Sequence, residues 1–364
     1  MSLSHSPSIV TTGLVLAYDM NNTGRSWRGA PTTNYISSPT NEVIASNEFA
    51  AYADLSPIFD TYGEGYYSIS ADIKSAVAGG ITVYTASGAV EYNIGYYNAA
   101  CETYYKRFYF DNILVTRTDP GASVSNLSFY GGYGSGLKPS IKNVQVEKTS
   151  FCSPFVIGTR TNTQSLLDIT GQHTLTSSLT YASDNTFSFA SASSNAIVVP
   201  LSTGFNKLTG SLNFWAYPTS YNGGNGYFVN RDDATANAVD WLWVGPYSGT
   251  FYFRLGDGSS CCANDLTIGS WSTVAPINTW INLCFTWTSA GTSVIYKNGE
   301  YVTSRAISAI PSTNPTSTGR IGLGHANADS FFNGKIATTH IYNRQLTATE
   351  VAQNFQATRG RYGL

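Results

Sequence analysis

The stretch GLVLAYDMNNTGRSW, residues 13–27, decides how the whole chain is organised. Its first eight residues, 13–20, are mostly apolar and favour an extended backbone, and the polar residues after them, with Gly24, are typical of a turn. We therefore predict a first β-strand over residues 13–20. The question that this strand raises is which later segments pair with it.

The composition favours a two-domain, β-rich protein. A chain of 364 residues is too long for one ordinary domain and fits two sandwich-sized domains. Charged residues make up only 12% of the chain, well below the roughly 25% that is usual for globular proteins. Ser, Thr, Asn, Gly and 25 tyrosines take their place. Such a surface of hydroxyls and amides suits proteins that work outside the cell or on a particle surface.

Charge and hydropathy argue against two classes of partner, nucleic acid and the membrane interior. The net charge is −2 and the basic residues are scattered, which argues against a nucleic-acid partner. No apolar run approaches the roughly 18 residues that span a bilayer, so we expect no membrane insertion. The N-terminus lacks the basic and apolar regions of a secretory signal. The five cysteines, odd in number and without a CxxC pair, argue against a disulfide framework or a zinc site, and the redox state of Cys261–Cys262 stays open.

Nearly every segment alternates with period two between Gly, Pro, Asn and Ser residues. The Asn298-Gly299 dipeptide between two short strands is the strongest local signal for a hairpin. Strands at this spacing, with no helical pattern between them, predict antiparallel sandwiches. The one helical pattern, LTATEVAQNF, has a Thr347-x-x-Glu350 capping box. The expected fold class is all-β: two antiparallel β-sandwiches with a short C-terminal helix.

Four segments of the C-terminal part resemble the laminin-G-like, concanavalin-A-like sandwich family. They occur in the family's order and at roughly its spacing: FSFASASSNAIVVP (187–200), SLNFWAYPTS (211–220), NTWINLCFTWTSAGTSVIYKNGEYV (278–302) and GRIGLGHANADSFFNGKIATTHIYNRQLTATEV (319–351). In that family the chain opens with a strand similar to GLVLAYD, which continues into a segment similar to LLDITGQHT. Here the second segment stands only at residues 166–174.

The resemblance implies that the sandwich is interrupted after its first strand. We expect residues 1–29 and 161–364 to form the laminin-G-like sandwich and residues 30–160 to form an inserted domain. Exposed turns tolerate such insertions because little buried backbone is disturbed. The insert resembles a carbohydrate-binding-module-type jelly roll in GYYSISADIKS, TYYKRFYFDN, NLSFYGGYG and PSIKNVQVEKTSFCSPFVIGTR. The last of these and the ending LTATEVAQNFQATRGRYG also resemble segments of tailed-phage virion proteins.

Catalysis is not expected. Retaining glycoside hydrolysis needs two carboxylates about 5–5.5 Å apart, and sandwich glycosidases commonly supply them from an E-x-D-x-E run that is absent here. The nearest acidic clusters, Asp232-Asp233 and Asp257, stand in turn-like settings. None of the four histidines has the sequence context of a nucleophile elbow, and His340, within a strand, is expected to be structural.

No cofactor or metal site is expected either. Calcium prefers six to eight oxygen ligands, and rim loops of such sandwiches sometimes supply them. The turn aspartates that could do so here are best explained as solvated side chains, because the spacing of a calcium loop is absent. They are Asp232, Asp233, Asp240, Asp257 and Asp329.

Aromatic residues are the candidates for a binding surface, because sugar rings stack on Trp and Tyr. DWLWVGPYSG places two tryptophans on one strand face with a tyrosine at the next turn, and SYNGGNGYF adds two tyrosines in a Gly-rich loop. Two alternatives stay open: the Trp pair could belong to the inter-sheet core, and the tyrosines could contact neighbouring subunits, where Tyr is enriched. The candidate contact residues are Tyr221, Tyr227, Trp241, Trp243, Tyr247 and, in the insert, Tyr133.

The sequence thus predicts a non-enzymatic structural component of a tailed-phage virion, exposed on the particle as a surface decoration or fibre-type protein. Its expected partners are other virion proteins of the capsid or tail, further copies of itself and host cell-surface glycans. The alternative is a glycan-binding adhesin whose main role is receptor recognition. A polysaccharide-degrading enzyme is a third, less favoured interpretation.

Overall fold

The chain forms two compact units in the computed structural model. The larger unit comprises Met1–Gly29, Asn162–Ala182 and Thr186–Leu364, and the smaller comprises Ala30–Thr161. The structure describes residues 7–44, 49–98, 103–116, 125–131, 139–182, 186–190, 195–200, 208–220, 226–230, 242–257, 263–308, 310, 319–322 and 331–364.

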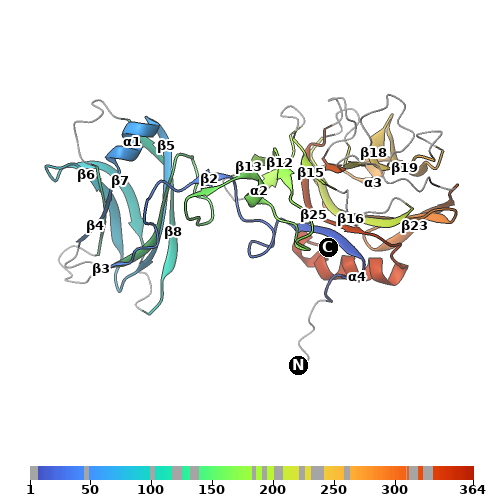
Figure 1. Ribbon diagram of the computed structural model, residues 1–364, viewed down its shortest axis with the longest axis horizontal. Helices are drawn as coiled ribbons and strands as arrows, with labels where there is room; N and C mark the ends of the chain where they lie inside the picture. The colour runs from blue at the N-terminus through green and yellow to red at the C-terminus, as the bar shows by residue number, and fades with distance from the viewer. Residues whose placement is uncertain are drawn as a thin grey trace. The chain divides into compact units, whose positions relative to one another are not determined.

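The larger unit is a sandwich of two antiparallel sheets (Figure 1). The six-stranded sheet has the order β1 (Leu14–Asp19), β25 (Gly334–Tyr342), β16 (Thr209–Pro218), β21 (Ile281–Thr288), β22 (Thr292–Lys297) and β23 (Glu300–Ala306). The seven-stranded sheet has the order β12 (Thr176–Ser177), β15 (Ile197–Val199), β24 (Gly319–Ile321), β17 (Phe228–Asn230), β18 (Leu242–Tyr247), β19 (Thr250–Leu255) and β20 (Leu266–Ser270). The remaining elements are β13 (Thr180–Tyr181), β14 (Phe187–Ser188), α2 (Asn162–Ser165), α3 (Trp271–Val274), α4 (Ala348–Thr358) and the short 3-10 helix η2 (Arg359–Tyr362).

The first strand lies in the six-stranded sheet. β1 pairs antiparallel with β25, with Ala17 opposite His340 and Asp19 opposite Thr338. The chain leaves this unit and returns to it at adjacent positions, because Trp27 forms an isolated β-bridge with Leu166. Residues more than 130 apart in sequence are therefore neighbours in space.

The core between the two sheets follows from the alternation of each strand. On β16, Leu212 and Phe214 face the seven-stranded sheet, and Phe214 stacks on Phe285 of the neighbouring strand β21 with ring centroids 6.0 Å apart. Phe253 of β19 stacks on the same Phe285 at 5.1 Å. Burial of each such side chain contributes about 1.5–3 kcal/mol to the stability of the unit.

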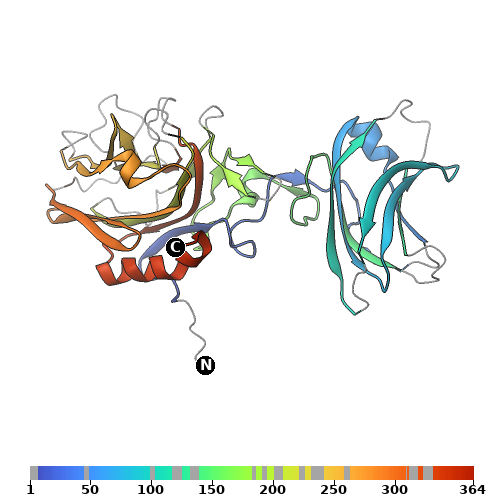
Figure 2. The same cartoon turned by 180° about the vertical axis from the view of Figure 1, so that it is seen from behind.

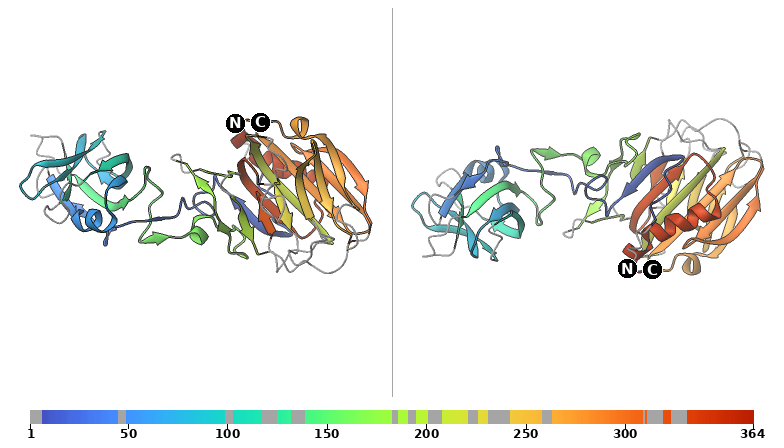
Figure 3. Two further views of the ribbon diagram at one scale, coloured as in Figure 1. Left: turned by 90° about the horizontal axis from the view of Figure 1, so that it is seen from above. Right: turned by 90° about the horizontal axis from the view of Figure 1, so that it is seen from below.

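The C-terminal helix covers the other face of the six-stranded sheet (Figure 3). Trp215, on the opposite side of β16 from Phe214, stacks on Tyr362 at 4.2 Å and donates its indole N–H to the hydroxyl of Thr358 at 2.8 Å. The helix begins with the capping box that the sequence predicted, in which the Thr347 side chain accepts from the Glu350 backbone N–H. The all-β class and the C-terminal helix are thus confirmed.

The smaller unit has jelly-roll topology (Figure 2). One sheet has the order β3 (Val43–Ile44), β10 (Ser140–Glu147), β5 (Gly65–Lys74) and β8 (Lys106–Val115). The other has the order β4 (Phe49–Asp54), β9 (Asn126–Tyr130), β6 (Gly79–Tyr84) and β7 (Val90–Tyr97). Counted along the chain from β3, these are the orders 1-8-3-6 and 2-7-4-5, which define a two-sheet jelly roll.

Two further elements belong to the smaller unit. Helix α1 (Ser56–Tyr62), which the strand pattern of the sequence did not indicate, buries Ile58 and Phe59 against the core. β2 (Thr32–Thr33) pairs with β11 (Thr159–Arg160), so the first and last segments of the unit run side by side. Among the helices in the described residues, none has the length and apolar character that crossing a bilayer requires.

Candidate functional site

The aromatic residues predicted from the sequence as contact residues lie in different places in the structure. Trp243 and Tyr247 lie on the same face of β18, the face turned away from the inter-sheet core. Tyr227 lies inside the core. The other three candidates, Tyr221, Trp241 and Tyr133, lie outside the described residues.

The prediction that Tyr227 contacts a ligand is wrong. Its side chain is only 3% exposed, and its ring lies 4.6 Å from that of Phe332 and 5.4 Å from that of Phe214. The Gly-rich sequence before it suggested a surface loop. However, the Tyr227 backbone already pairs with Val244 at the start of β17, and this register turns its side chain inward.

Trp243 is also buried, but on the outer face of the sheet. The side chain is 4% exposed and packs with Ala196, Tyr252 and Phe331 in a small cluster separate from the main core. A ring covered in this way offers no face to a sugar, so the prediction of direct contact by Trp243 is wrong. The inter-sheet alternative is also wrong, because the residue faces outward from the sandwich.

Arg254 joins these aromatic residues into one group. It lies opposite Trp243 in the β18–β19 register, and its guanidinium carbon lies 4.4 Å from the ring centroid of Tyr252 and 5.0 Å from those of Tyr247 and Trp243. A guanidinium within about 6 Å of aromatic rings gains cation–π attraction. Its Nε also lies 3.2 Å from an Asp265 carboxylate oxygen. We call these five residues the arginine–aromatic cluster.

The acidic member of the cluster, Asp265, has an altered ionisation. Burial raises its pKa from 3.8 to about 6, and the charges of Arg254 and Arg305 oppose this shift. The second carboxylate oxygen is buried and has no hydrogen-bond partner in the described part of the chain. The side chain of Arg254 is only 11% exposed. Asp265 and Arg254 therefore form a largely buried ion pair, with the two side chains 16% and 11% exposed.

The exposed part of the cluster is formed by tyrosine. Tyr247 ends β18 beside the Ser248-Gly249 turn, where both residues have positive φ, and its side chain is 54% exposed. Tyr252 is half-buried next to it, with the two ring centroids 6.5 Å apart. The electron-rich face of an aromatic ring attracts positively polarised C–H groups. An exposed tyrosine beside a guanidinium is therefore suited to stack on a sugar and to hydrogen-bond its hydroxyls.

Sequence reasoning missed Tyr252, Arg254 and Asp265. The sequence contained the signal for Tyr252 and Arg254. Counting outward from the Ser248-Gly249 turn places Arg254 opposite Trp243, and Tyr252 lies two residues earlier on the same face of the strand. Asp265 could not be found in this way, since it reaches Arg254 from the loop before β20.

Tyrosines of the smaller unit also include both buried and exposed side chains. In the stretch Tyr92–Tyr97, Tyr97 is buried and donates its hydroxyl to the Tyr130 carbonyl at 2.7 Å, while Tyr92 packs against Phe59. Tyr96 points outward and is 72% exposed. Only the outward tyrosine is available for contact with a partner or a ligand.

Metal ligands do not gather in the part of the chain that the structure describes, where no group of three or more His, Cys, Asp or Glu side chains could hold an ion. Four of the aspartates weighed as calcium ligands, Asp232, Asp233, Asp240 and Asp329, lie outside that part, as do Cys261 and Cys262. Cys152 and Cys284 are buried free thiols, and burial raises the pKa of both.

One protein-family model matches part of the larger unit. Residues 191–352 match the laminin-G-type family model described as the concanavalin A-like lectin/glucanases superfamily. These residues contain the seven-stranded sheet except β12, and the strands of the six-stranded sheet except β1. This part of the larger unit is therefore similar to the concanavalin A-like sandwiches of laminin-G type. No curated protein matches the chain.

Solved structures show weaker similarity. The binding domain of Paraclostridial Mosquitocidal Protein 1 is 18% identical, with a TM-score of 0.42 over 52% of this chain and 49% of that one. The botulinum neurotoxin serotype D binding domain is 18% identical, with a TM-score of 0.41 over 53% and 49%. Domain 4 of AbnA, an extracellular arabinanase from Geobacillus stearothermophilus solved with arabinotriose, is 18% identical, with a TM-score of 0.40 over 51% and 91%. The chain thus spans about half the length of the two toxin domains.

Proposed function

We propose that this protein is a non-enzymatic glycan-binding protein that contacts its ligand with the arginine–aromatic cluster. The observation that carries the proposal is the guanidinium of Arg254, fixed between the rings of Trp243, Tyr247 and Tyr252 and paired with Asp265. The buried members fix the geometry, and Tyr247 presents the exposed ring. The similarity of the larger unit to the concanavalin A-like lectin/glucanase superfamily is consistent with this role.

The absence of catalysis is part of the proposal. Glycoside hydrolysis uses two carboxylates that flank the scissile bond, about 5–9.5 Å apart. The cluster supplies one carboxylate, Asp265, which is already paired with Arg254. We expect the purified protein to release no reducing ends from any polysaccharide that it binds.

The test is binding to a glycan array, followed by calorimetry with the best ligand. Tyr247→Ala should weaken binding about tenfold, because loss of one stacking ring removes on the order of 1.4 kcal/mol. Tyr301→Ala is the matched control, since Tyr301 lies in the same unit and is 61% exposed, but on β23 of the other sheet. Equal affinity of both variants and the native protein would refute the assignment of the site.

We also propose that the protein is a structural component at the surface of a tailed-phage virion, with other virion proteins and further copies of itself as partners. This part is supported by the resemblance of PSIKNVQVEKTSFCSPFVIGTR and LTATEVAQNFQATRGRYG to virion proteins and by the low proportion of charged residues. Glycan binding and a place on the particle are compatible, as in a receptor-recognition adhesin. Immunogold labelling of purified particles tests it, and particles without label would contradict it.

A further inference from the structure

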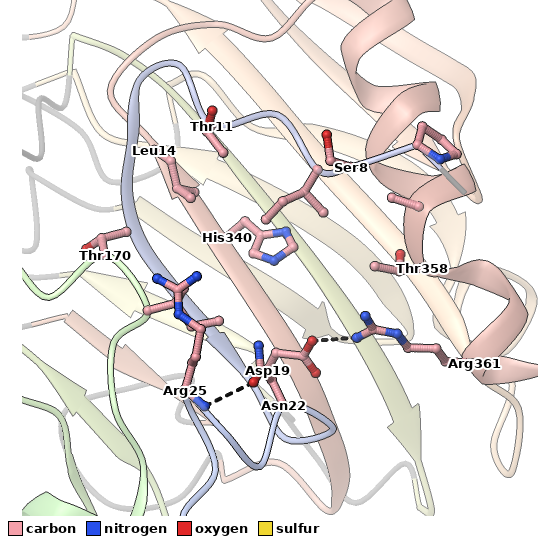
Figure 4. A pocket seen from close by; sticks show the side chains of 14 residues that line it. Ser8, Thr11, Leu14, Asp19, Asn22, Arg25, Thr170, His340, Thr358 and Arg361 are labelled. Atoms are coloured by element: carbon pink, nitrogen blue, oxygen red, sulfur yellow. Dashed lines mark hydrogen bonds and ion pairs between the residues drawn. The ribbon is translucent and has the colours of Figure 1, made fainter. Parts of the chain in front are cut away.

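A pocket of about 530 Å³ lies on the outer face of the six-stranded sheet, away from the arginine–aromatic cluster (Figure 4). Its walls are the N-terminal segment at residues 7–11, the turn at residues 22–25, the loop at residues 169–170 and the end of α4 with η2. No motif of the sequence indicated it, because these segments are far apart along the chain.

The imidazole of His340 forms the floor of the pocket. Burial lowers the pKa of His340 to about 4, so the ring is neutral at neutral pH. Asn282 donates its amide to the Asn213 oxygen at 3.0 Å, which leaves the Asn213 N–H to face His340 Nδ1 at 3.4 Å. The ring proton is therefore placed on Nε2, which has no hydrogen-bond partner in the described part of the chain.

Two arginines stand on either side of this histidine in Figure 4. Arg361 pairs with Asp19, with 2.5 Å between Nη1 and Oδ2, and keeps a 47% exposed side chain. Arg25 is exposed, and its guanidinium has neither an ion pair nor a hydrogen bond among the described residues. With two cations and one carboxylate, the lining carries a net charge of +1.

We propose that this pocket binds a monoanionic, polyhydroxylated acid, with a uronic acid residue as the ligand class. Its carboxylate would pair with Arg25 and accept from His340 Nε2–H, because charge-assisted hydrogen bonds are the strongest available here. The same pocket is lined by the hydroxyls of Ser8 and Thr11 and the amide of Asn22. These groups would form hydrogen bonds with the ligand's hydroxyls. The net charge of +1 balances one carboxylate, and the cavity volume lies in the range of small-ligand sites.

Calorimetry with glucuronic and galacturonic acid, each compared with its methyl ester, tests the proposal on the full chain. The ester keeps the ring and hydroxyls and removes only the charge, so it should bind at least about tenfold more weakly than the acid. Arg25→Gln should weaken acid binding by a similar factor, and Arg25→Lys should restore part of it. Arg28→Gln is the matched control, because Arg28 is an exposed arginine of the same segment that does not line the pocket.

Three results would overturn the proposal: no binding of either acid at millimolar concentration, equal binding of acid and ester, or equal competition by sulfate or phosphate, which would make this a general anion site. The inference stands apart from the proposed glycan surface. Tyr247→Ala should leave acid binding in the pocket unchanged, and Arg25→Gln should leave binding at the arginine–aromatic cluster unchanged. Failure of one site is thereby distinguished from failure of the other.

Discussion

The backbone N–H of Ala17 donates a 2.9 Å hydrogen bond to the carboxylate of Asp168, which lies 151 positions further along the chain. The same carboxylate accepts from the backbone N–H groups of Thr170, Gln172 and His173 and from the Thr170 hydroxyl. Asp168 therefore fixes the loop after α2 against β1. It joins the two parts of the larger unit that are separated in sequence by the jelly roll.

Replacement of Asp168 by Asn should lower the free energy of unfolding of the larger unit by about 3 kcal/mol, because hydrogen bonds to a charged group are worth about 1.5–3 kcal/mol each. Asn has the same shape as Asp, but its amide N–H₂ group would replace one acceptor oxygen and would face backbone N–H donors. Urea denaturation measures the change. Glu300→Ala, at an exposed hairpin position of the same unit, is the control and should stay within about 0.5 kcal/mol of the native protein.

Local signals in the sequence were reliable where a few neighbouring residues determine the backbone. Asn298 and Gly299 adopt the positive φ angles of the hairpin between β22 and β23, as the dipeptide predicted. The Thr347–Glu350 capping box begins α4 as predicted. Both depend on contacts within four residues, so no knowledge of the tertiary structure was needed.

The candidate sites could not be found in this way, because they depend on register and on distant contacts. Tyr227 and Tyr247 have similar Gly-rich surroundings in the sequence, yet one is 3% and the other 54% exposed. Which of the two points outward is set by pairing with Val244 and Thr250, not by composition. The pocket over His340 needs both ends of the chain and a loop beyond residue 160, so only the folded structure brings its lining together.

Asn354 of α4 links the helix to the N-terminal segment and to the end of β25. Its side-chain oxygen accepts from the Val10 backbone N–H at 2.8 Å, and its amide donates to the Tyr342 hydroxyl at 3.0 Å. Asn354→Leu leaves both groups buried without these partners and should cost about 2–3 kcal/mol in the free energy of unfolding. Gln356→Leu, on the exposed side of the same helix, should change it little. Equal denaturation midpoints for the two variants would disprove the role of Asn354.

The free energy of unfolding of the larger unit should depend on pH through Glu350, the acidic residue of the α4 capping box. Arg344 holds the Glu350 carboxylate through two hydrogen bonds at 2.6 and 2.8 Å, and this interaction lowers the pKa of Glu350 from 4.5 to about 2. A lowered pKa in the folded state means that the contribution is fully present above about pH 4.5 and is lost as the pH falls toward 2. Urea denaturation at pH 5 and pH 3 should therefore show a smaller loss of stability for Glu350→Gln than for the native protein. A parallel loss for both would contradict the assignment.

A buried glutamate connects the first and last segments of the smaller unit. Glu147 is fully buried at the end of β10 and accepts from the Thr32 hydroxyl at 2.6 Å and from the hydroxyl and backbone N–H of Ser153 at 2.6 and 2.9 Å. Arg160 donates to the carbonyls of Ala30 and Pro154, and its Nη1 lies 3.4 Å from the Ser153 hydroxyl. The polar groups of the segment SPFVIGTR are thus satisfied by side chains of the jelly roll.

Glu147→Ala should destabilise the smaller unit by about 3 kcal/mol, because it leaves the buried hydroxyl and backbone N–H of Ser153 and the partly buried hydroxyl of Thr32 without this acceptor. Glu147→Gln keeps one acceptor oxygen and should cost less than Glu147→Ala. Hydrogen exchange followed by mass spectrometry locates the effect: faster exchange is expected within Ala30–Thr161 and unchanged exchange in the strands of the larger unit. Exchange that rises equally in both units would show that Glu147 does not act within the jelly roll alone.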